Sequence, residues 1–388
     1  MSTSYGTRTS ARPLRVLMVC HYYPPHVGGI ENVARREAIG LARQGADVTV
    51  VTSAGRSSVT REDGVRVVRV AAWNGAERKA GVPYPFFSPA LLPVALRWAR
   101  HADAVHIHDC LYLSSWAAGL AAGLTRTPYV LTQHVAVVDH PSGLVRAVQR
   151  AFYGVAGRAL LRGARAVFTL NATVADFVRS HGARPGRARH LANGVDTELF
   201  RPAADDDERQ LARKRLGLPE DRVLVLFVGR LVPKKGYDLL LAAHTPDAGY
   251  DLVFAGDGDA GALAGREGVH HIGALPPERV AEAYRACDVF ALPSTAEGFP
   301  LTVQEAMASG LPVVTTDDPG YAPYALDREL VALLPREVPA IAAELRALAA
   351  DPERRARMAA YSRAYAEGDF AWDEHVRTLM RHYGGERP

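Results

Sequence analysis

Residues 223–236 read Val223-Leu-Val-Leu-Phe-Val-Gly-Arg-Leu-Val-Pro-Lys-Lys-Gly236. The apolar run up to Val228 has the composition of a strand buried on both faces of a parallel sheet. A loop bounded by two glycines follows, and the pattern predicts a helix over 236–243. Arg230 and Lys235 are therefore expected beside the start of a helix, where backbone N–H groups and the helix dipole favour an anion such as a diphosphate. A solvated turn is the other interpretation of this segment taken alone.

Strands and helices alternate outward from this stretch in both directions. Parallel strands are predicted at the apolar runs 14–20, 47–52, 65–70, 104–108, 129–132, 166–170, 251–255, 289–292 and 313–316. Helices are predicted over 30–44, 115–124, 143–163, 172–180, 277–286 and 302–308, and the segment 337–383 is predicted to be helical. This alternation indicates parallel sheets with right-handed crossovers. A break rich in turn and acidic residues at 193–219 predicts a linker between two α/β domains. A ligand is expected in a cleft between the carboxyl ends of their sheets.

Length and composition agree with two globular domains. The chain has 388 residues, 48% of them hydrophobic and 23% charged, which excludes a disordered or fibrous protein. No apolar run reaches the ~18–20 residues of a membrane span, and the polar segment 1–12 predicts a disordered tail without a signal peptide. The three cysteines show neither metal nor disulfide spacing, which predicts a reducing, cytoplasmic setting.

Charge is distributed unevenly along the chain. Residues 1–200 carry 24 basic and 12 acidic side chains, whereas residues 201–388 carry 22 and 30. A basic first half favours an anionic partner, such as a phosphorylated acceptor or a membrane surface, although solubility alone also explains it. The segment 143–165 is basic and amphipathic. We expect it to pack on its own sheet, with a peripheral contact at an anionic membrane as the alternative.

Two carboxylates lie eight residues apart in Glu297-Gly-Phe-Pro-Leu-Thr-Val-Gln-Glu305. A helix that begins near Leu301 would direct the free N–H groups of Leu301, Thr302 and Val303 toward a ligand. Glu305, one turn into the helix, is placed to accept hydrogen bonds from ribose hydroxyls, and Glu297 on the loop from sugar hydroxyls. A metal site or an acid/base pair is the alternative for two such carboxylates, and neither has a His or Asp close by in sequence.

This pair, followed by Ala306-Met-Ala-Ser-Gly-Leu-Pro-Val-Val314, resembles the signature of the retaining glycosyltransferase family 4, which has the GT-B fold. Other segments match the family in the correct order from His21 to Trp372. They are His21-Tyr-Tyr-Pro-Pro-His-Val-Gly-Gly-Ile-Glu31, Asn193-Gly-Val-Asp196, Gly229 to Gly236, Leu252-Val-Phe-Ala-Gly-Asp-Gly258 and Phe370-Ala-Trp372. The resemblance implies two Rossmann-like parallel-sheet domains that face each other across a cleft.

The resemblance also implies roles for the residues that bind the donor. Arg230 and Lys235 would hold the diphosphate leaving group, with the amides of residues 301–303. Glu305 would bind the ribose, and Glu297 the hydroxyls of the transferred sugar. All four side chains would belong to the second domain, residues 199–372.

The first domain would comprise residues 13–198, with a C-terminal helix at about 373–388 crossing back to it. The resemblance implies that Gly28 and Gly29 let the loop approach the donor phosphates. His134 matches the active-site histidine that faces the sugar, although Val135 stands where the family usually has a small residue. Asp109 is expected to line the acceptor side.

The predicted reaction is transfer of a hexosyl residue from a nucleoside diphosphate sugar to a hydroxyl acceptor, with retention at the anomeric carbon. No carboxylate is evident as a nucleophile, which favours front-face attack. The donor is expected to be a UDP-sugar, with a GDP-sugar as the alternative. The acceptor is expected to be a glycan, glycolipid or small molecule, phosphorylated or lipid-linked. The resemblance implies no metal and no cofactor, and no nucleic acid is expected as a partner.

Three further patterns invite other interpretations. Gly256-Asp-Gly-Asp-Ala-Gly261 fits the dinucleotide-binding fingerprint, but it lies mid-chain and has no room for the long helix that a nicotinamide site needs. Asp257 and Asp259 in the same loop mimic a metal-binding Asp-x-Asp. His106 and His108 lie on one face of a predicted strand and could suggest a metal site, but the resemblance implies no metal, so we interpret them as structural.

Two other classes of function stay open at this point. A nucleotide-sugar epimerase also uses two facing Rossmann-like domains, but it would need acid/base carboxylates where this chain has ligands for phosphates and hydroxyls. A sugar-nucleotide-binding regulator would bind the donor without turning it over, so slow hydrolysis of the donor would exclude it.

Overall fold

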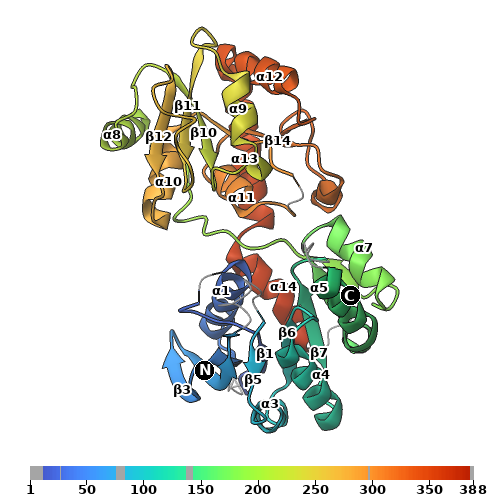
Figure 1. The fold of residues 1–388 in the computed structure, drawn as a ribbon. Coiled ribbons are helices and arrows are strands. Elements are labelled where there is room, and N and C mark those ends of the chain that lie inside the picture. Colours follow the sequence, from blue (N-terminus) through green and yellow to red (C-terminus); the bar gives the residue numbers. More distant parts are fainter. Residues whose placement is uncertain (1–11, 27, 76–83, 137–142, 296–297, 385–388) are drawn as a thin grey trace, which may run out of the picture. The chain divides into compact units, whose positions relative to one another are not determined.

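The computed structural model describes residues 12–26, 28–75, 84–136, 143–295 and 298–384 (Figure 1). The chain divides into two compact units. Unit 1 comprises residues 1–169, 176–189 and 376–388, and unit 2 comprises residues 170–175 and 190–375. Each unit is a sheet covered by helices, which confirms the predicted α/β class with two parallel-sheet domains. The predicted tail at 1–12 lies outside the described residues except for Arg12.

The sheet of unit 1 has the strand order β3-β4-β2-β1-β6-β7-β8-β9, with β5 paired to β4. The pairs that β1 makes with β2 and β6, and that β7 makes with β6 and β8, are parallel. The elements in chain order are β1 (Arg15–Val19), α1 (Gly29–Arg43), β2 (Asp47–Ala54), β3 (Ser58–Glu62), β4 (Val65–Trp73), β5 (Phe86–Phe87), α3 (Leu91–Ala99), β6 (Ala104–His108), α4 (Leu113–Thr125), β7 (Tyr129–Gln133), α5 (Gly143–Phe152), a π-helix (Tyr153–Gly157), α6 (Arg158–Gly163), β8 (Val167–Thr169), α7 (Ala172–Ser180) and β9 (Ala188–His190).

Two antiparallel strands, β3 and β5, join β4, and the sequence pattern did not predict them. Strand β3 is mostly exposed, so it lacks the apolar run that identifies a buried strand. Its signal is the Asp63-Gly64 dipeptide, whose φ values of 51° and 83° suit a two-residue hairpin turn.

The sheet of unit 2 has the order β12-β11-β10-β13-β14-β15, and every described pair in it is parallel. Strand β11 is buried along its whole length, as the apolar run predicted. The elements are α8 (Asp206–Leu216), β10 (Val223–Val228), a 3-10 helix (Pro233–Lys235), α9 (Tyr237–Ala243), β11 (Tyr250–Ala255), β12 (Val269–Gly273), α10 (Pro277–Ala286), β13 (Val289–Leu292), α11 (Leu301–Ala308), β14 (Val313–Thr316), a 3-10 helix (Pro319–Tyr324), β15 (Ala332–Leu334), α12 (Val338–Ala350), α13 (Pro352–Asp369) and α14 (Trp372–Gly384).

Helix α8 corrects the predicted break at 193–219. The acidic cluster there is the start of a helix, because the Asp205 side chain caps it by accepting from the Glu208 amide at 2.9 Å. Acidic residues fill its first turn and basic residues its last, which complements the helix dipole. The four-residue acidic run was therefore a capping signal and not a linker.

The segments that resemble the family's entry to and exit from the second domain are paired in unit 2. Val195 forms a parallel bridge with Ala371, and its amide donates to the Phe370 carbonyl at 2.7 Å. The His375 Nδ1 atom lies 2.8 Å from the Ala192 carbonyl. Helix α14 starts directly after this point, and from Val376 onward it belongs to unit 1.

Candidate functional site

The predicted donor-binding residues of unit 2 follow two neighbouring strands. Strand β10 lies between β11 and β13, and the chain runs from β10 to β11 before it crosses back to β13. The loops after β10 and β13 therefore diverge at the carboxyl edge of the sheet, where open α/β sheets form their binding crevice. Residues 229–236 form the first of these loops, and residues 293–295 and 298–300 are the described part of the second.

Backbone contacts fix the loop after β10 against the loop after β13. Gly236 has φ 78°, and a Cβ atom there would overlap the Pro293 carbonyl. The Thr295 amide donates to the Lys234 carbonyl at 2.9 Å, and Arg336 Nε donates to the Pro293 carbonyl at 2.8 Å. Only glycine meets both the angle and the close approach at position 236.

The glycines of the Gly256–Gly261 segment serve the same kind of packing. A Cβ atom on Gly256, where φ is 156°, would overlap the Gly229 carbonyl. The Leu231 amide donates to the Asp257 carbonyl at 2.8 Å. No helix occurs between residues 256 and 268, so this motif lacks the helix N-terminus on which a dinucleotide phosphate would bind.

The two predicted cations lie on the loop after β10. Arg230 is exposed and Lys235 is partly exposed. The Lys235 side chain packs over Gly229, with its Cδ atom 3.8 Å from where a Cβ atom of that glycine would lie. Arg230 has no ion-pair partner among the residues that the structure describes. This leaves its guanidinium available to a ligand.

Helix α11 begins after Pro300, with no side chain capping its N-terminus. The Val303 amide donates to the Pro300 carbonyl at 3.0 Å, which differs from the expectation that this amide is free. A tight first turn after proline explains the difference. Leu301 is exposed and Thr302 partly exposed, so their amides are the ones left for a ligand. Glu297 lies outside the described residues.

Glu305 is held by Tyr284. The Tyr284 hydroxyl lies 3.1 Å from Glu305 Oε2 and 3.0 Å from the Thr302 carbonyl, and it donates its one proton to either. Burial raises the pKa of Glu305 to about 7. The residue as a whole is nevertheless partly exposed. A desolvated acceptor that still reaches the surface suits a ligand hydroxyl, which would supply the hydrogen bonds that water no longer gives.

In unit 1 the corresponding point is the carboxyl end of β1, which lies between β2 and β6 in the sheet. The loop after β1 carries His21, whose ring stacks on Tyr112 with centroids 3.5 Å apart; burial lowers the pKa of His21 to about 3. Glu31 lies 3.2 Å from His26, and a Cβ atom on Gly28 would overlap its carboxylate. By contrast, a Cβ atom on Gly29 meets no atom within 4 Å. A side chain at position 28 would therefore displace the end of the flexible Glu31 side chain, whereas one at position 29 would displace nothing.

Asp109 is fully buried and has the left-handed φ of 65°. Gln133 Nε2 donates to its Oδ1 atom at 2.9 Å and the Leu111 amide at 3.3 Å. Burial raises the pKa of Asp109 to about 6. The Oδ2 atom has no hydrogen-bond partner among the described residues. A strained backbone angle and an unsatisfied carboxylate oxygen are typical of a functional position.

His134 follows β7, and its ring stacks on that of His108. His106 and His108 both point toward Glu37 of α1, at 3.5 and 3.4 Å. The sequence therefore placed both histidines correctly on one face of β6. One potential metal-ligand atom from each of Glu37, His106 and His108 lies within 4.8 Å of the other two, a spacing that a metal ion could bridge. His106 Nδ1 is also hydrogen-bonded to the Tyr383 hydroxyl at 2.7 Å.

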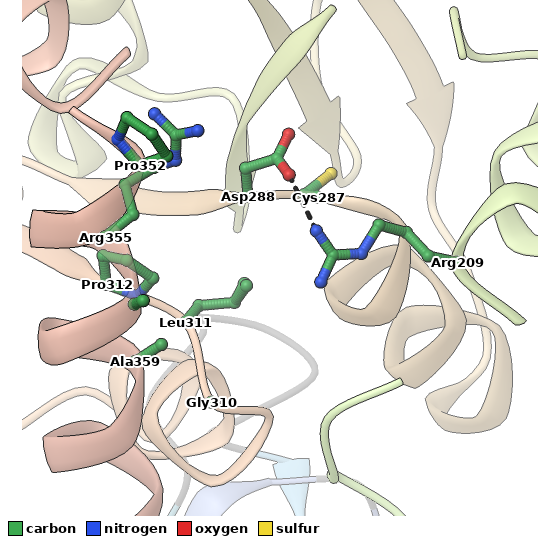
Figure 2. Close-up of a pocket in the computed structure, with 10 residues that line it drawn as sticks. Arg209, Cys287, Asp288, Gly310, Leu311, Pro312, Pro352, Arg355 and Ala359 are labelled. Carbon is green, nitrogen blue, oxygen red and sulfur yellow. Dashed lines mark hydrogen bonds and ion pairs between the residues drawn. The ribbon is translucent and has the colours of Figure 1, made fainter. Parts of the chain in front are cut away.

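A hollow of about 270 Å³ in unit 2 lies at the opposite edge of its sheet (Figure 2). Asp288 and Pro312, which line it, come just before β13 and β14 and so mark the amino edge. Arg209 points to Asp288, with an ion pair of 3.1 Å. Because this hollow lies at the edge of the sheet opposite to the loops that follow β10 and β13, we assign it no part in donor binding.

Known proteins share the features of both units. Residues 27–199 match the model of the family described as Glycosyltransferase Family 4, and residues 208–365 match that of Glycosyl transferases group 1. The D-inositol 3-phosphate glycosyltransferase of Xylanimonas cellulosilytica is 34% identical, over 92% of this chain and 91% of that protein. The enzyme of the same name from Salinispora arenicola is 30% identical, over 98% and 93%. The chain belongs to glycosyltransferase family 4.

Solved structures agree with this assignment at the level of the fold. Anabaena Alr3699/HepE in complex with UDP superimposes with a TM-score of 0.73 at 18% identity, covering 96% of this chain and 100% of that one. Sucrose-phosphate synthase from Thermosynechococcus elongatus gives a TM-score of 0.70 at 21% identity, covering 96% and 98%. The family models and the relatives confirm the resemblance seen in the sequence, and the chain is a glycosyltransferase. No helix among the described residues is long and apolar enough to cross a membrane.

Three residues next to the predicted site of this glycosyltransferase were not predicted from the sequence. Tyr284 reaches Glu305 from α10, Glu37 reaches the histidines from α1, and Tyr383 reaches His106 from α14. Each belongs to an ordinary amphipathic helix. Glu37 offered a clue, because it falls between Ala34 and Leu41 on the apolar face, where a carboxylate is unusual.

Proposed function

We propose that this glycosyltransferase transfers a hexosyl residue from a UDP-sugar to a hydroxyl of a phosphorylated acceptor, with retention at the anomeric carbon. The observation that carries the proposal is the arrangement at the carboxyl edge of unit 2. There, a loop with Arg230 and Lys235 is locked against the loop that leads into α11, and Glu305 lies one turn inside that helix.

Each part of this edge suits one part of a nucleoside diphosphate sugar. Arg230, Lys235 and the amides of Leu301 and Thr302 would bind the diphosphate, whose charge they complement. Glu305 would accept from the ribose hydroxyls. The fold neighbour Alr3699/HepE was solved with UDP and with UDP-glucose, which supports a uridine donor ahead of GDP-sugars.

The acceptor is proposed from charge and from the relatives. The first half of the chain has twice as many basic as acidic side chains, which favours a phosphorylated acceptor over a neutral one. The curated relatives carry D-inositol 3-phosphate in their names. We propose that Asp109 and His134 act on this side, Asp109 toward the acceptor and His134 toward the transferred sugar.

We propose a front-face reaction, in which the departing diphosphate takes the proton of the acceptor hydroxyl. As the glycosidic bond breaks, negative charge grows on the leaving group. Arg230, Lys235 and the amides of Leu301 and Thr302 stabilise that charge without rearranging. A single lost contact of this kind typically raises a barrier by ~2.7–4 kcal/mol.

The test has two stages. Calorimetric titration with UDP, GDP, ADP and dTDP should show UDP binding most tightly. Incubation with UDP-glucose and either D-inositol 3-phosphate or unphosphorylated inositol should then give product mainly from the phosphate, with an axial anomeric bond by NMR. Absence of nucleotide binding, or an inverted product, would refute the proposal. Equal turnover of inositol and its phosphate would refute the choice of acceptor.

A further inference from the structure

A hollow of about 590 Å³ in unit 1 lies at the amino ends of three neighbouring strands. Residues 126–129 lead into β7, residues 163–165 into β8, and residues 184–187 into β9. Asp109 and His134, by contrast, follow the carboxyl ends of β6 and β7. Strand β7 has five residues, which span ~16 Å when extended. The hollow is therefore separate from the residues of unit 1 that are proposed to act in sugar transfer.

Four positive side chains line this hollow. They are Arg126, Arg165, Arg184 and Arg187. Among the described residues, no carboxylate lines the hollow and none forms an ion pair with these four guanidinium groups. Exposed arginines elsewhere in the chain, such as Arg201 and Arg328, pair with carboxylates at 2.8 and 2.6 Å. Like charges gathered in one hollow repel one another and attract an anion, whose binding relieves the repulsion.

Backbone contacts hold two of these side chains in place without neutralising them. The Arg187 Nη1 atom donates to the Arg165 carbonyl at 2.8 Å and to the Ala164 carbonyl at 3.5 Å. Its Nε and Nη2 atoms make no hydrogen bond with the described residues, so they are available to a ligand. The Arg165 Nη1 atom donates to the Tyr383 carbonyl at 3.4 Å, a long contact with a neutral group. Both cations are thus oriented by the fold and keep their charge.

Arg126 occupies a backbone conformation that favours glycine. It ends α4 with a φ of 57°, in the left-handed region, where a side chain costs stability relative to glycine. A cation next to a helix C-terminus recovers part of that cost. The chain therefore has an arginine where the backbone alone would select glycine, and such a residue is typical of a functional position.

Small residues form the walls between the arginines. Gly163 packs against Tyr129, because a Cβ atom there would overlap the tyrosine hydroxyl, whereas a Cβ atom on Gly123 would meet no atom within 4 Å. Burial raises the pKa of Tyr129 to about 12 and the charge of Arg184 opposes that shift, which agrees with a guanidinium close to the phenol ring. A hollow of this volume is large enough for a phosphorylated small molecule or a lipid headgroup.

We propose that this hollow is a second anion-binding site, which binds a phosphate-bearing ligand through Arg126, Arg184 and Arg187. Planar guanidinium groups bind phosphate oxygens through paired, charge-assisted hydrogen bonds, which favours phosphate over a single carboxylate. The site does not depend on the proposed sugar transfer, because it lies at the opposite edge of the sheet.

The phosphate has two possible sources, a soluble metabolite or a phospholipid headgroup. Leu120 and Leu124 of α4 are 52% and 64% exposed, and each directly follows a glycine that lines the hollow. A phospholipid would have apolar contacts with these two side chains in addition to the contacts of its phosphate, whereas a soluble phosphate would not. The two leucines therefore distinguish the sources.

The test measures binding of inorganic tripolyphosphate by calorimetry, with saturating UDP to occupy the proposed donor site. It compares the double variant Arg126→Gly/Arg184→Gln with Arg56→Gln/Arg61→Gln, which removes two exposed arginines near β3, at the other end of the sheet. The wild type should bind one tripolyphosphate per chain. The first variant should bind at least about tenfold more weakly, since charge-assisted contacts are lost, and the control should bind within about twofold of the wild type.

Glycine at position 126 suits the left-handed angle and Arg184 is exposed, so the first variant should fold, which circular dichroism checks. Equal affinities of the two double variants would overturn the inference, because diffuse surface charge would then explain the binding. Wild-type binding that does not saturate would overturn it as well. Normal sugar transfer by the first variant, together with its weakened tripolyphosphate binding, would support a site separate from the reaction.

Vesicles of phosphatidylcholine, with and without phosphatidic acid, identify the source of the phosphate. Sedimentation with the phosphatidic acid vesicles that is lost in both Arg126→Gly/Arg184→Gln and Leu120→Ser/Leu124→Ser assigns a lipid headgroup to the site. Saturable tripolyphosphate binding without sedimentation assigns a soluble ligand. In either case the Leu120→Ser/Leu124→Ser protein should bind tripolyphosphate as the wild type does.

Discussion

Replacing Glu305 by glutamine should stabilise the free protein and weaken its binding to the donor. Burial raises the pKa of this carboxyl from 4.5 to about 7. Each pKa unit corresponds to about 1.4 kcal/mol, so the ionised form costs the folded protein about 3.5 kcal/mol above pH 7. Partial exposure of the side chain makes this an upper value.

The sign follows from proton binding. The folded protein holds the Glu305 proton more tightly than the unfolded chain does, so this contribution to stability is fully present below pH 4.5 and is lost as the pH rises through about 7. Glutamine resembles the protonated form at every pH. The variant should therefore match the wild type near pH 4.5 and exceed its unfolding free energy by about 2–3 kcal/mol at pH 8.

Urea denaturation without ligand, at pH 5 and at pH 8, measures this difference. Glu329→Gln, at an exposed position of the same unit, controls for the simple loss of a negative charge. At pH 8 the Glu305→Gln variant should also bind UDP about ten- to a hundredfold more weakly, since ribose hydroxyls lose a charged acceptor worth ~1.5–3 kcal/mol. A stability difference that is the same at both pH values would refute the burial argument. Unchanged UDP affinity would refute the ribose assignment.

Three further outcomes are expected. Lys235→Ala should lower the transfer rate ~10²-fold or more while donor affinity falls less, because its contact strengthens as the leaving group gains charge; Lys234→Ala is the control, and a folded Lys235→Ala protein with over half the wild-type rate would remove Lys235 from the site. Turnover should survive EDTA nearly intact, since side chains are proposed to neutralise the diphosphate, and a complete loss restored by Mg²⁺ or Mn²⁺ would contradict this. Gly236→Ala should lower the melting temperature and abolish UDP binding by calorimetry, because its Cβ would overlap the Pro293 carbonyl; wild-type behaviour would contradict the described loop contact.

Local sequence patterns determined the fold class and the family. The strand at 223–228 and the helix at 172–180 were predicted at the residues where the structure has them, because apolar periodicity reports burial directly. The family was identified from the motifs Gly229 to Gly236 and Glu297 to Val314, because each requires specific residues at a fixed spacing. Where the local signal was weak, as in exposed strand β3 or in the acidic start of α8, the pattern missed the element.

Only the tertiary structure decided the protonation states of the side chains in the candidate site. Glu305 and Asp109 look like ordinary carboxylates in the sequence, and their raised pKa values arise from the elements packed around them. Glu37 of α1 lies near His108 of β6, and His108 contacts His134 at the end of β7, although these pairs are 71 and 26 positions apart along the chain. Such contacts depend on sheet order and helix packing, which bring distant side chains together without leaving a periodic trace. The sequence therefore determined which functional groups the site contains, and the fold determined their protonation states and their hydrogen-bond partners.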